Sequence, residues 1–207
     1  LEGVDWVTAS ASWILGENLE NLSLAEGGNY NGTGNEAANL LYGNAGNNIL
    51  DGKLGADTMN GGDGNDTYLV DNLGDVASEY AGSMVDLVKS TVTHTLGNGI
   101  ENLTLLGTMD INGTGNSLDN VIRGNASRNL LSGGYGFDTV YGGAGNDDLS
   151  SADGMDLLLG GLGNDTYFLG YDSDDVVEYW AQGTDTVLAS VTYAYTLGEH
   201  IENLILL

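Results

Sequence analysis

The chain has 207 residues, with 30 Asp and Glu against 4 Lys and Arg, and it contains no Cys. The formal net charge of −26 argues against binding to nucleic acid or to an anionic membrane surface, because such binding depends on Lys and Arg. Disulfides and cysteine metal sites are excluded, and no apolar run approaches the roughly 18 residues of a membrane-spanning helix, so we expect no membrane insertion.

The first segment, residues 1–33, is predicted to form flanking β coils, since residues 22–24 (LSL) alternate apolar and polar side chains. The sequence LENL at residues 19–22 recurs as IENL at residues 100–103 and 201–204. The chain therefore begins and ends within a repeating pattern, and we interpret it as part of a longer protein.

Residues 34–69 and 115–168 consist of nine-residue repeats, four in the first segment and six in the second. Position 6 of every repeat is Asp or Asn, and position 8 is always apolar. The position-8 residues are Leu41, Leu50, Met59, Tyr68, Ile122, Leu131, Val140, Leu149, Leu158 and Tyr167. One apolar residue in nine does not fit an amphipathic helix, and Gly within a helix costs about 1 kcal/mol relative to Ala.

The repeat predicts an all-β fold, a parallel β-roll or β-solenoid with calcium between stacked turns. Glycine permits positive φ, so six residues can turn tightly while three form a short strand with position 8 inward. Alternate turns then lie on opposite sides, and two repeats make one coil. We predict a first roll over 34–69, a β connector over 70–114, a second roll over 115–168 and a partial third flanking unit over 169–207.

The stacked turns need a cation. Turns i and i+2 lie on the same side at the interstrand spacing of about 4.8 Å, which aligns their position-6 carboxylates. Two unit charges about 5 Å apart repel by roughly 3 kcal/mol at an effective dielectric near 20. Calcium takes oxygen ligands at about 2.3–2.6 Å, so an ion midway between the turns fits this spacing. Zinc is unsupported, because Cys is absent and His94 and His200 lie outside the turns.

Repeats such as GGDGNDTYL (61–69) and GGLGNDTYF (160–168) resemble the RTX, or hemolysin-type, calcium-binding repeats of secreted bacterial proteins. The resemblance implies that position-6 side chains and backbone carbonyls bind calcium between turns i and i+2. Its strongest implied sites pair Asp138 with Asp156 and Asp147 with Asp165. Further implied pairs, for up to about six ions in all, are Asn39 with Asp57, Asn48 with Asp66, Asn120 with Asp138, and Asn129 with Asp147.

The resemblance also implies backbone carbonyl ligands. These are the carbonyls of Gly61, Gly133, Gly134, Gly136, Gly142, Gly143, Ala144, Gly145, Gly160, Gly161 and Gly163. Turn 151–159 opens with Ser151 and Ala152 in place of two glycines, which alters the expected carbonyl geometry.

Two points stay open at the level of the sequence. The GNxxxN turns, at 34–42, 43–51, 115–123 and 124–132, either bind calcium more weakly, because Asn lacks the charge, or stack through amide hydrogen bonds without metal. Asp71, Asp75 and Glu79 follow the first roll, and they either close its end with another calcium ion or form a solvated acidic connector.

The leading functional hypothesis is a non-catalytic module that folds on calcium binding, with no catalytic residue predicted. By resemblance, such chains leave bacteria unfolded through type I secretion and fold outside, where they stabilise or space an attached domain. One alternative is an adhesive or carbohydrate-binding module for extracellular polysaccharide, with Trp6, Trp13 and Trp180 as stacking surfaces. Another is the C-terminal calcium-binding part of a secreted polysaccharide-modifying enzyme, protease or lipase.

Overall fold

The structure, a computed structural model, describes residues 3–79, 84–150, 152–170, 174–190 and 195–207. Every regular element in these residues is a β-strand, and none of them forms a helix that could cross a membrane. The chain divides into two compact units, residues 1–92 with 96–100 and residues 93–95 with 101–207. The boundary between the units falls within the predicted connector, 70–114.

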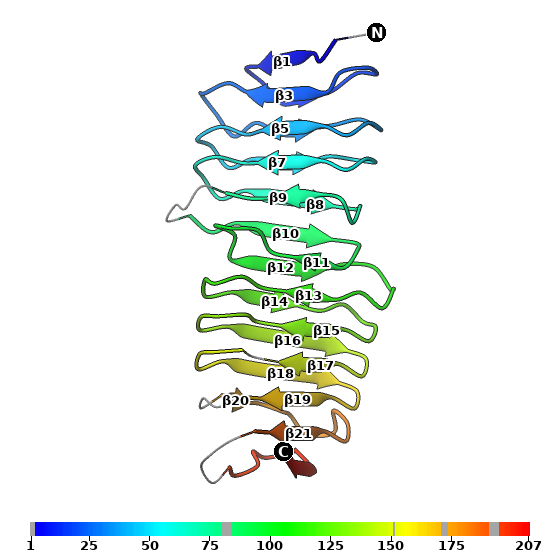
Figure 1. Ribbon diagram of the computed structural model, residues 1–207, viewed down its shortest axis with the longest axis vertical. Coiled ribbons are helices and arrows are strands. Elements are labelled where there is room, and N and C mark those ends of the chain that lie inside the picture. Colours follow the sequence, from blue (N-terminus) through cyan, green and yellow to red (C-terminus); the bar gives the residue numbers. More distant parts are fainter. Residues whose placement is uncertain (1–2, 80–83, 151, 171–173, 191–194) are drawn as a thin grey trace. The chain divides into compact units, whose positions relative to one another are not determined.

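The first unit consists of two parallel sheets, and consecutive strands alternate between them (Figure 1). One sheet has the order β1 (Trp6–Ala9), β3 (Asn21–Leu24), β5 (Leu40–Tyr42), β7 (Thr58–Asn60) and β9 (Val76–Ala77). The other has the order β2 (Trp13–Ile14), β4 (Gly32–Thr33), β6 (Ile49–Asp51), β8 (Thr67–Val70) and β10 (Leu87–Ser90). Each coil therefore gives one strand to each sheet.

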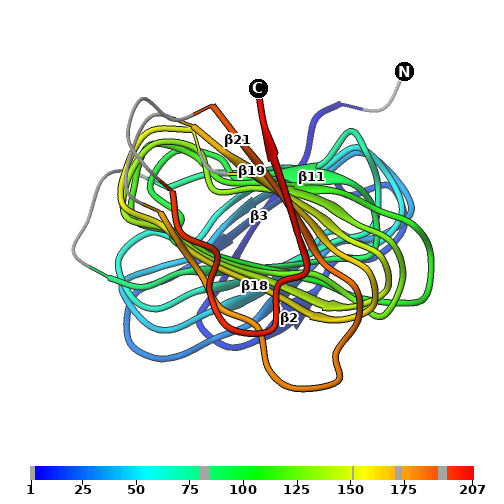
Figure 2. The same ribbon diagram turned by 90° about the horizontal axis from the view of Figure 1, so that it is seen from below.

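The second unit repeats this arrangement. One sheet contains β12 (Asn102–Leu105), β14 (Val121–Arg123), β16 (Thr139–Ala144), β18 (Leu157–Leu162) and β20 (Asp175–Val176). The other contains β11 (His94–Thr95), β13 (Gly113–Thr114), β15 (Leu130–Ser132), β17 (Asp148–Ser150), β19 (Thr166–Leu169), β21 (Thr186–Ala189) and β22 (Asn203–Leu206). Viewed from below, the green and yellow coils of this unit overlie one another, so their turns form columns (Figure 2).

The register confirms the predicted eighteen-residue coil. Leu131 pairs with Leu149, and Leu149 pairs with Tyr167, each step being two nonapeptides. All ten position-8 side chains are fully buried, so the core of each roll is a stack of these residues. The all-β solenoid of parallel strands is the fold that the repeat predicts.

Glycine is required where a turn lies against the turn one coil away. Gly143, at position 2, has a φ of 109°, and a Cβ there would lie 2.6 Å from the carbonyl oxygen of Asn125. Only a residue without a side chain adopts this φ readily and tolerates so close a backbone. The glycines therefore bring carbonyl oxygens close to the neighbouring turn in each column.

Candidate metal centre

The position-6 carboxylates link turns that are stacked one coil apart. Oδ1 of each Asp accepts a hydrogen bond from the backbone N–H of the position-6 residue eighteen residues earlier. In the two strongest predicted pairs, Asp138 donates to Asp156 and Asp147 donates to Asp165, both at 2.7 Å. The other four pairs have the same bond, from Asn39 to Asp57, Asn48 to Asp66, Asn120 to Asp138 and Asn129 to Asp147, at 2.6–2.8 Å. The fold thus brings together all six pairs predicted from the sequence.

The second carboxylate oxygen has a different environment. Oδ2 is buried and has no hydrogen-bond partner within the described residues in Asp57, Asp66, Asp138, Asp147 and Asp165. These five residues are at most 2% exposed. A buried carboxylate without a compensating donor or cation is strongly unfavourable, so these oxygens are the atoms left for a cation to bind.

Glycine leaves space beside these oxygens. A Cβ on Gly142 would lie 2.6 Å from Asp147 Oδ2 and 2.5 Å from the carbonyl oxygen of Gly160, which belongs to the stacked turn. Both distances are far shorter than an ordinary van der Waals contact, so a side chain at this position would collide with both oxygens. Glycine at position 1 therefore lets a carboxylate oxygen of its own turn and a carbonyl oxygen of the stacked turn both approach its Cα.

The predicted carbonyl donors fall into two groups. A carbonyl oxygen faces a glycine of the stacked turn at Gly61, Gly133, Gly136, Gly142, Gly143, Gly145, Gly160 and Gly163. The remaining three, Gly134, Ala144 and Gly161, are followed eighteen residues later by Ala152, Leu162 and Tyr179. In these three cases the residue eighteen positions later has a side chain, whereas each of the eight carbonyls above faces a glycine. Ser151, at the start of turn 151–159, lies outside the described residues.

The Asn turns are closed by their own side chains. Asn39 Oδ1 accepts the backbone N–H of Asn35 at 2.7 Å, and Asn48 Oδ1 accepts that of Asn44 at 2.8 Å. The corresponding bonds in the second roll run from Asn116 to Asn120 and from Asn125 to Asn129. The Nδ2 groups donate to backbone carbonyls of the preceding coil, as from Asn48 to Tyr30 at 2.6 Å. In each pair of one Asn and one Asp, these contacts favour the alternative in which the Asn turn stacks through amide hydrogen bonds and its side chain does not bind calcium.

The backbone at position 2 explains the difference between Asn and Asp turns. Position 2 of the Asp turns has positive φ at Lys53 (66°), Gly62 (98°), Gly134 (99°), Gly143 (109°) and Gly161 (95°). In the Asn turns, position 2 is Asn and its φ is not positive, so its N–H can reach the amide oxygen of position 6. The residue at position 2 is therefore a sequence signal for the two kinds of turn.

Burial raises the pKa of the turn carboxyls far above 3.8. The pKa of Asp57, Asp138 and Asp147 rises to about 6, and that of Asp66 and Asp165 rises to about 7. The largest cause is desolvation, which the backbone N–H bonds to each carboxylate offset only in part. In the absence of a cation these groups bind protons near neutral pH, and metal binding must displace those protons.

The acidic residues after the first roll have separate roles. Asp75 accepts the backbone N–H of Asp57 at 3.0 Å, and Glu79 accepts those of Gly61 and Gly62 at 2.7 and 3.2 Å. Asp71 is exposed, and no three-carboxylate group forms from Asp71, Asp75 and Glu79 in the described structure. The expectation of a solvated connector is wrong for Asp75 and Glu79, because both are buried against backbone donors of the last turns.

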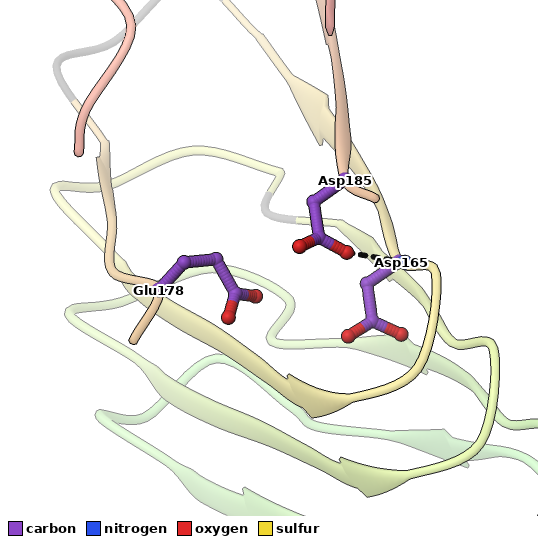
Figure 3. A group of neighbouring side chains, drawn as sticks. All are labelled: Asp165, Glu178 and Asp185. Atoms are coloured by element: carbon purple, nitrogen blue, oxygen red, sulfur yellow. Dashed lines mark hydrogen bonds between the residues drawn. The ribbon is translucent and has the colours of Figure 1, made fainter. Parts of the chain in front are cut away.

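The sequence did not predict that Asp165, Glu178 and Asp185 would lie together. Asp165, Glu178 and Asp185 are all buried, and ligand oxygens from the three lie within 4.8 Å of one another (Figure 3). Sequence comparison of the two rolls contains a signal for it. Glu79 and Glu178 each lie eighteen residues after the first glycine of the last turn, at Gly61 and Gly160.

The comparisons with known proteins agree with this geometry. The family model of the RTX calcium-binding nonapeptide repeat (4 copies) matches residues 33–68, 114–149 and 132–167. No curated protein matches the chain. The two stretches of stacked turns, with their position-6 Asp and Asn residues, belong to the RTX calcium-binding nonapeptide repeat family.

Proposed function

We propose that this chain is the calcium-responsive module of a secreted bacterial protein, which folds on calcium binding outside the cell and stabilises or spaces an attached domain. The observation that carries the proposal is the set of buried Asp Oδ2 atoms without donors in the described residues. The RTX β-roll is a structural calcium-binding module and not a catalytic one, so any catalytic activity would belong to another domain of the parent protein.

The coupling of folding to calcium follows from electrostatics. The chain carries a net charge of −26, and the fold places Asp carboxylates of adjacent turns side by side in a buried environment. Without a cation, mutual repulsion and desolvation both oppose folding. A bound calcium ion offsets both the repulsion and the desolvation, so the free energy of calcium binding stabilises the folded state. Such a chain would stay expanded at low intracellular calcium, which suits export by type I secretion, and would fold in a calcium-rich medium.

The test is a far-UV circular dichroism titration of the metal-free chain with calcium, with magnesium as the control ion. We expect a cooperative gain of β signal with calcium and none at equal magnesium, because magnesium demands octahedral geometry and retains its water. A full β spectrum in chelator, unchanged by calcium, would show that the core and the Asn turns suffice, and the proposal would be wrong.

A second candidate function is carbohydrate binding. It is favoured by exposed tryptophans, since Trp180 is 82% exposed, Trp6 55% and Trp13 46%. The Trp6 ring is stacked on Tyr42, with ring centroids 6.1 Å apart and planes 9° apart, which gives it a fixed orientation. Flat aromatic surfaces of this kind can stack on sugar rings. Binding of the calcium-loaded chain on a polysaccharide array, lost in Trp180→Ala or Trp6→Ala, would support this function, and an array without binding would exclude it.

A further inference from the structure

Three buried carboxylates converge where the chain leaves the second roll. Asp165 precedes β19, Glu178 follows β20 and Asp185 precedes β21, and their exposed fractions are 1%, 6% and 1%. Figure 3 shows the carboxylates of Glu178 and Asp185 directed toward that of Asp165. An ion with calcium–oxygen bonds of about 2.3–2.6 Å can join oxygens that are up to about 5 Å apart. The observed limit of 4.8 Å therefore allows one ion to contact all three residues.

Hydrogen bonding leaves two of these carboxylate oxygens without a donor. Asp185 Oδ1 accepts the backbone N–H of Asp165 at 2.8 Å, and Glu178 Oε1 accepts the hydroxyl of Tyr167. Asp165 Oδ2 and Glu178 Oε2 are buried and have no hydrogen-bond partner within the described residues. Both are on side chains more than nine-tenths buried, so water cannot replace the missing donors freely.

Among the described residues, the salt bridges join Lys53 to Asp51 and Arg128 to Asp148, and neither includes this group of carboxylates. The sequence after Arg128 contains thirteen Asp and Glu and no Lys or Arg. Buried charges in proteins are paired with an opposite charge or coordinate a metal ion. Because neither salt bridge of the described residues includes this group, a bound cation is the remaining way to keep the three groups charged.

The first roll has the same residues but closes differently. Its counterparts are Asp66, Glu79 and Asp86, and Asp86 accepts the backbone N–H of Asp66 at 2.7 Å. Both oxygens of Glu79 accept backbone N–H groups, from Gly61 and from Gly62. Glu79 thus has both oxygens bonded to backbone N–H groups, whereas Glu178 Oε2 has no hydrogen bond within the described residues, although the N–H groups of Gly161 and Tyr179 are near enough to favour its charged form.

The position of Glu178 in the stack explains its role. It lies eighteen residues after Gly160, where a further turn would place its first glycine. In the turns below, the carbonyl of that glycine faces the stacked turn, as Gly160 O faces Gly142. At the end of the roll, the carboxylate of Glu178 takes the place of that glycine carbonyl. Asp165 and Asp185 supply the other two carboxylates.

We propose that Asp165, Glu178 and Asp185 form a calcium site at the end of the second roll, with two ligands from outside the nonapeptides. This inference deepens the proposed function, because it adds a site of different composition to the calcium-loaded turns. The three carboxylates bind one ion that fixes the segment after β20 and the start of β21 to the last nonapeptide. In the first roll, Glu79 instead accepts the backbone N–H groups of Gly61 and Gly62, so it is not a ligand of an ion of this kind.

The test is the number of calcium ions bound per full-length chain, measured by equilibrium dialysis and by isothermal titration calorimetry. Glu178→Gln keeps an oxygen for the Tyr167 hydroxyl but removes the charge, and we expect it to bind one ion fewer than the unmodified chain. Glu79→Gln is the matched control in the first roll, and we expect it to leave the count unchanged. Asp185→Asn, which retains an acceptor for the Asp165 N–H, should lose the same single ion as Glu178→Gln.

A second readout uses terbium, a luminescent substitute for calcium. Tyr167 donates its hydroxyl to Glu178, so excitation of tyrosine should sensitise an ion at this site. We expect the sensitised emission to fall in Glu178→Gln and in Asp185→Asn, but not in Glu79→Gln.

The outcomes separate this inference from the proposed function. An unmodified chain that binds no calcium would overturn the proposed function itself. A chain that binds calcium with the same count in Glu178→Gln and Asp185→Asn would overturn only the new site, even if both variants were less stable. Should Glu178→Gln fail to fold in saturating calcium, the count in Asp185→Asn decides in the same way.

Discussion

At position 6 of the turn, Asp and Asn have nearly the same shape but leave different atoms without partners. The Asn48 amide uses its oxygen for the N–H of Asn44 and its nitrogen for the carbonyl of Tyr30. Asp66 uses Oδ1 for the N–H of Asn48, while its Oδ2 has no donor within the described residues. The charged side chain therefore makes its turn depend on a cation, and the neutral one allows its turn to close without it.

Replacing Asp66 with Asn should weaken calcium binding, because the charged ligand is lost and the positive φ of Gly62 turns the position-2 N–H away. We expect the calcium concentration at the folding midpoint to rise on the order of tenfold, in line with the value of charge-assisted contacts. Asp63→Asn, an exposed change of equal charge in the same turn, is the control. Equal midpoints for the two variants would contradict a ligand role for Asp66.

The strands of the rolls are too short to be stable by themselves. β15 has three residues, and its middle residue, Leu131, is fully buried, whereas its neighbour Leu130 is 51% exposed. Parallel pairing with β13 and β17 stacks Leu131 against Leu149 in the same column. Stability therefore comes from the repeated contact of position-8 side chains along the stack, and a gap in one coil affects the coils above and below.

Leu131→Ala should lower the free energy of unfolding by about 2–5 kcal/mol, because it leaves a cavity in the stack. Leu130→Ala, in the same strand, should change it by less than about 0.5 kcal/mol, since its side chain lies at the surface. Urea denaturation in saturating calcium measures both values. A similar loss for the two variants would show that position 8 does not carry the core.

Over the whole molecule, an excess of acidic groups links folding to pH as well as to calcium. Burial raises the pKa of Asp57, Asp138 and Asp147 to about 6 and that of Asp66 and Asp165 to about 7. Ordinary Asp in an unfolded chain has a pKa of about 3.9. The metal-free folded state therefore binds more protons than the unfolded state between these values. Its stability is greatest below the unfolded pKa and is lost as the pH rises through 6 to 7.

The metal-free chain should therefore gain β structure when the pH falls from 8 to 5, and it should lose that structure again on return to pH 8. In the same range the calcium midpoint should move to higher concentration at lower pH, because protons compete for the same carboxylates. Circular dichroism of the dialysed chain, with and without calcium, measures both effects. A metal-free spectrum and a calcium midpoint that are both independent of pH would contradict this linkage.

The sequence by itself determined the period, the core and the pairing of turns. Nine residues per turn place Asp147 and Asp165 one coil apart, and the same spacing buries every position-8 residue. These features are readable because they depend on the covalent spacing of residues along one regular strand-and-turn path. The distinction between GN and GG turns was also present in the sequence, although its meaning depended on the direction of the N–H at position 2.

Only the tertiary structure decided which oxygens remain without partners and what closes each roll. Asp185 lies twenty residues after Asp165, so the eighteen-residue spacing does not predict that they meet. Asp75 and Glu79 cap backbone donors instead of forming a solvated connector, and Glu178 leaves an oxygen free. The physical reason is that residues outside the nonapeptides do not follow the nine-residue period, so their contacts depend on how these segments pack against the last coil.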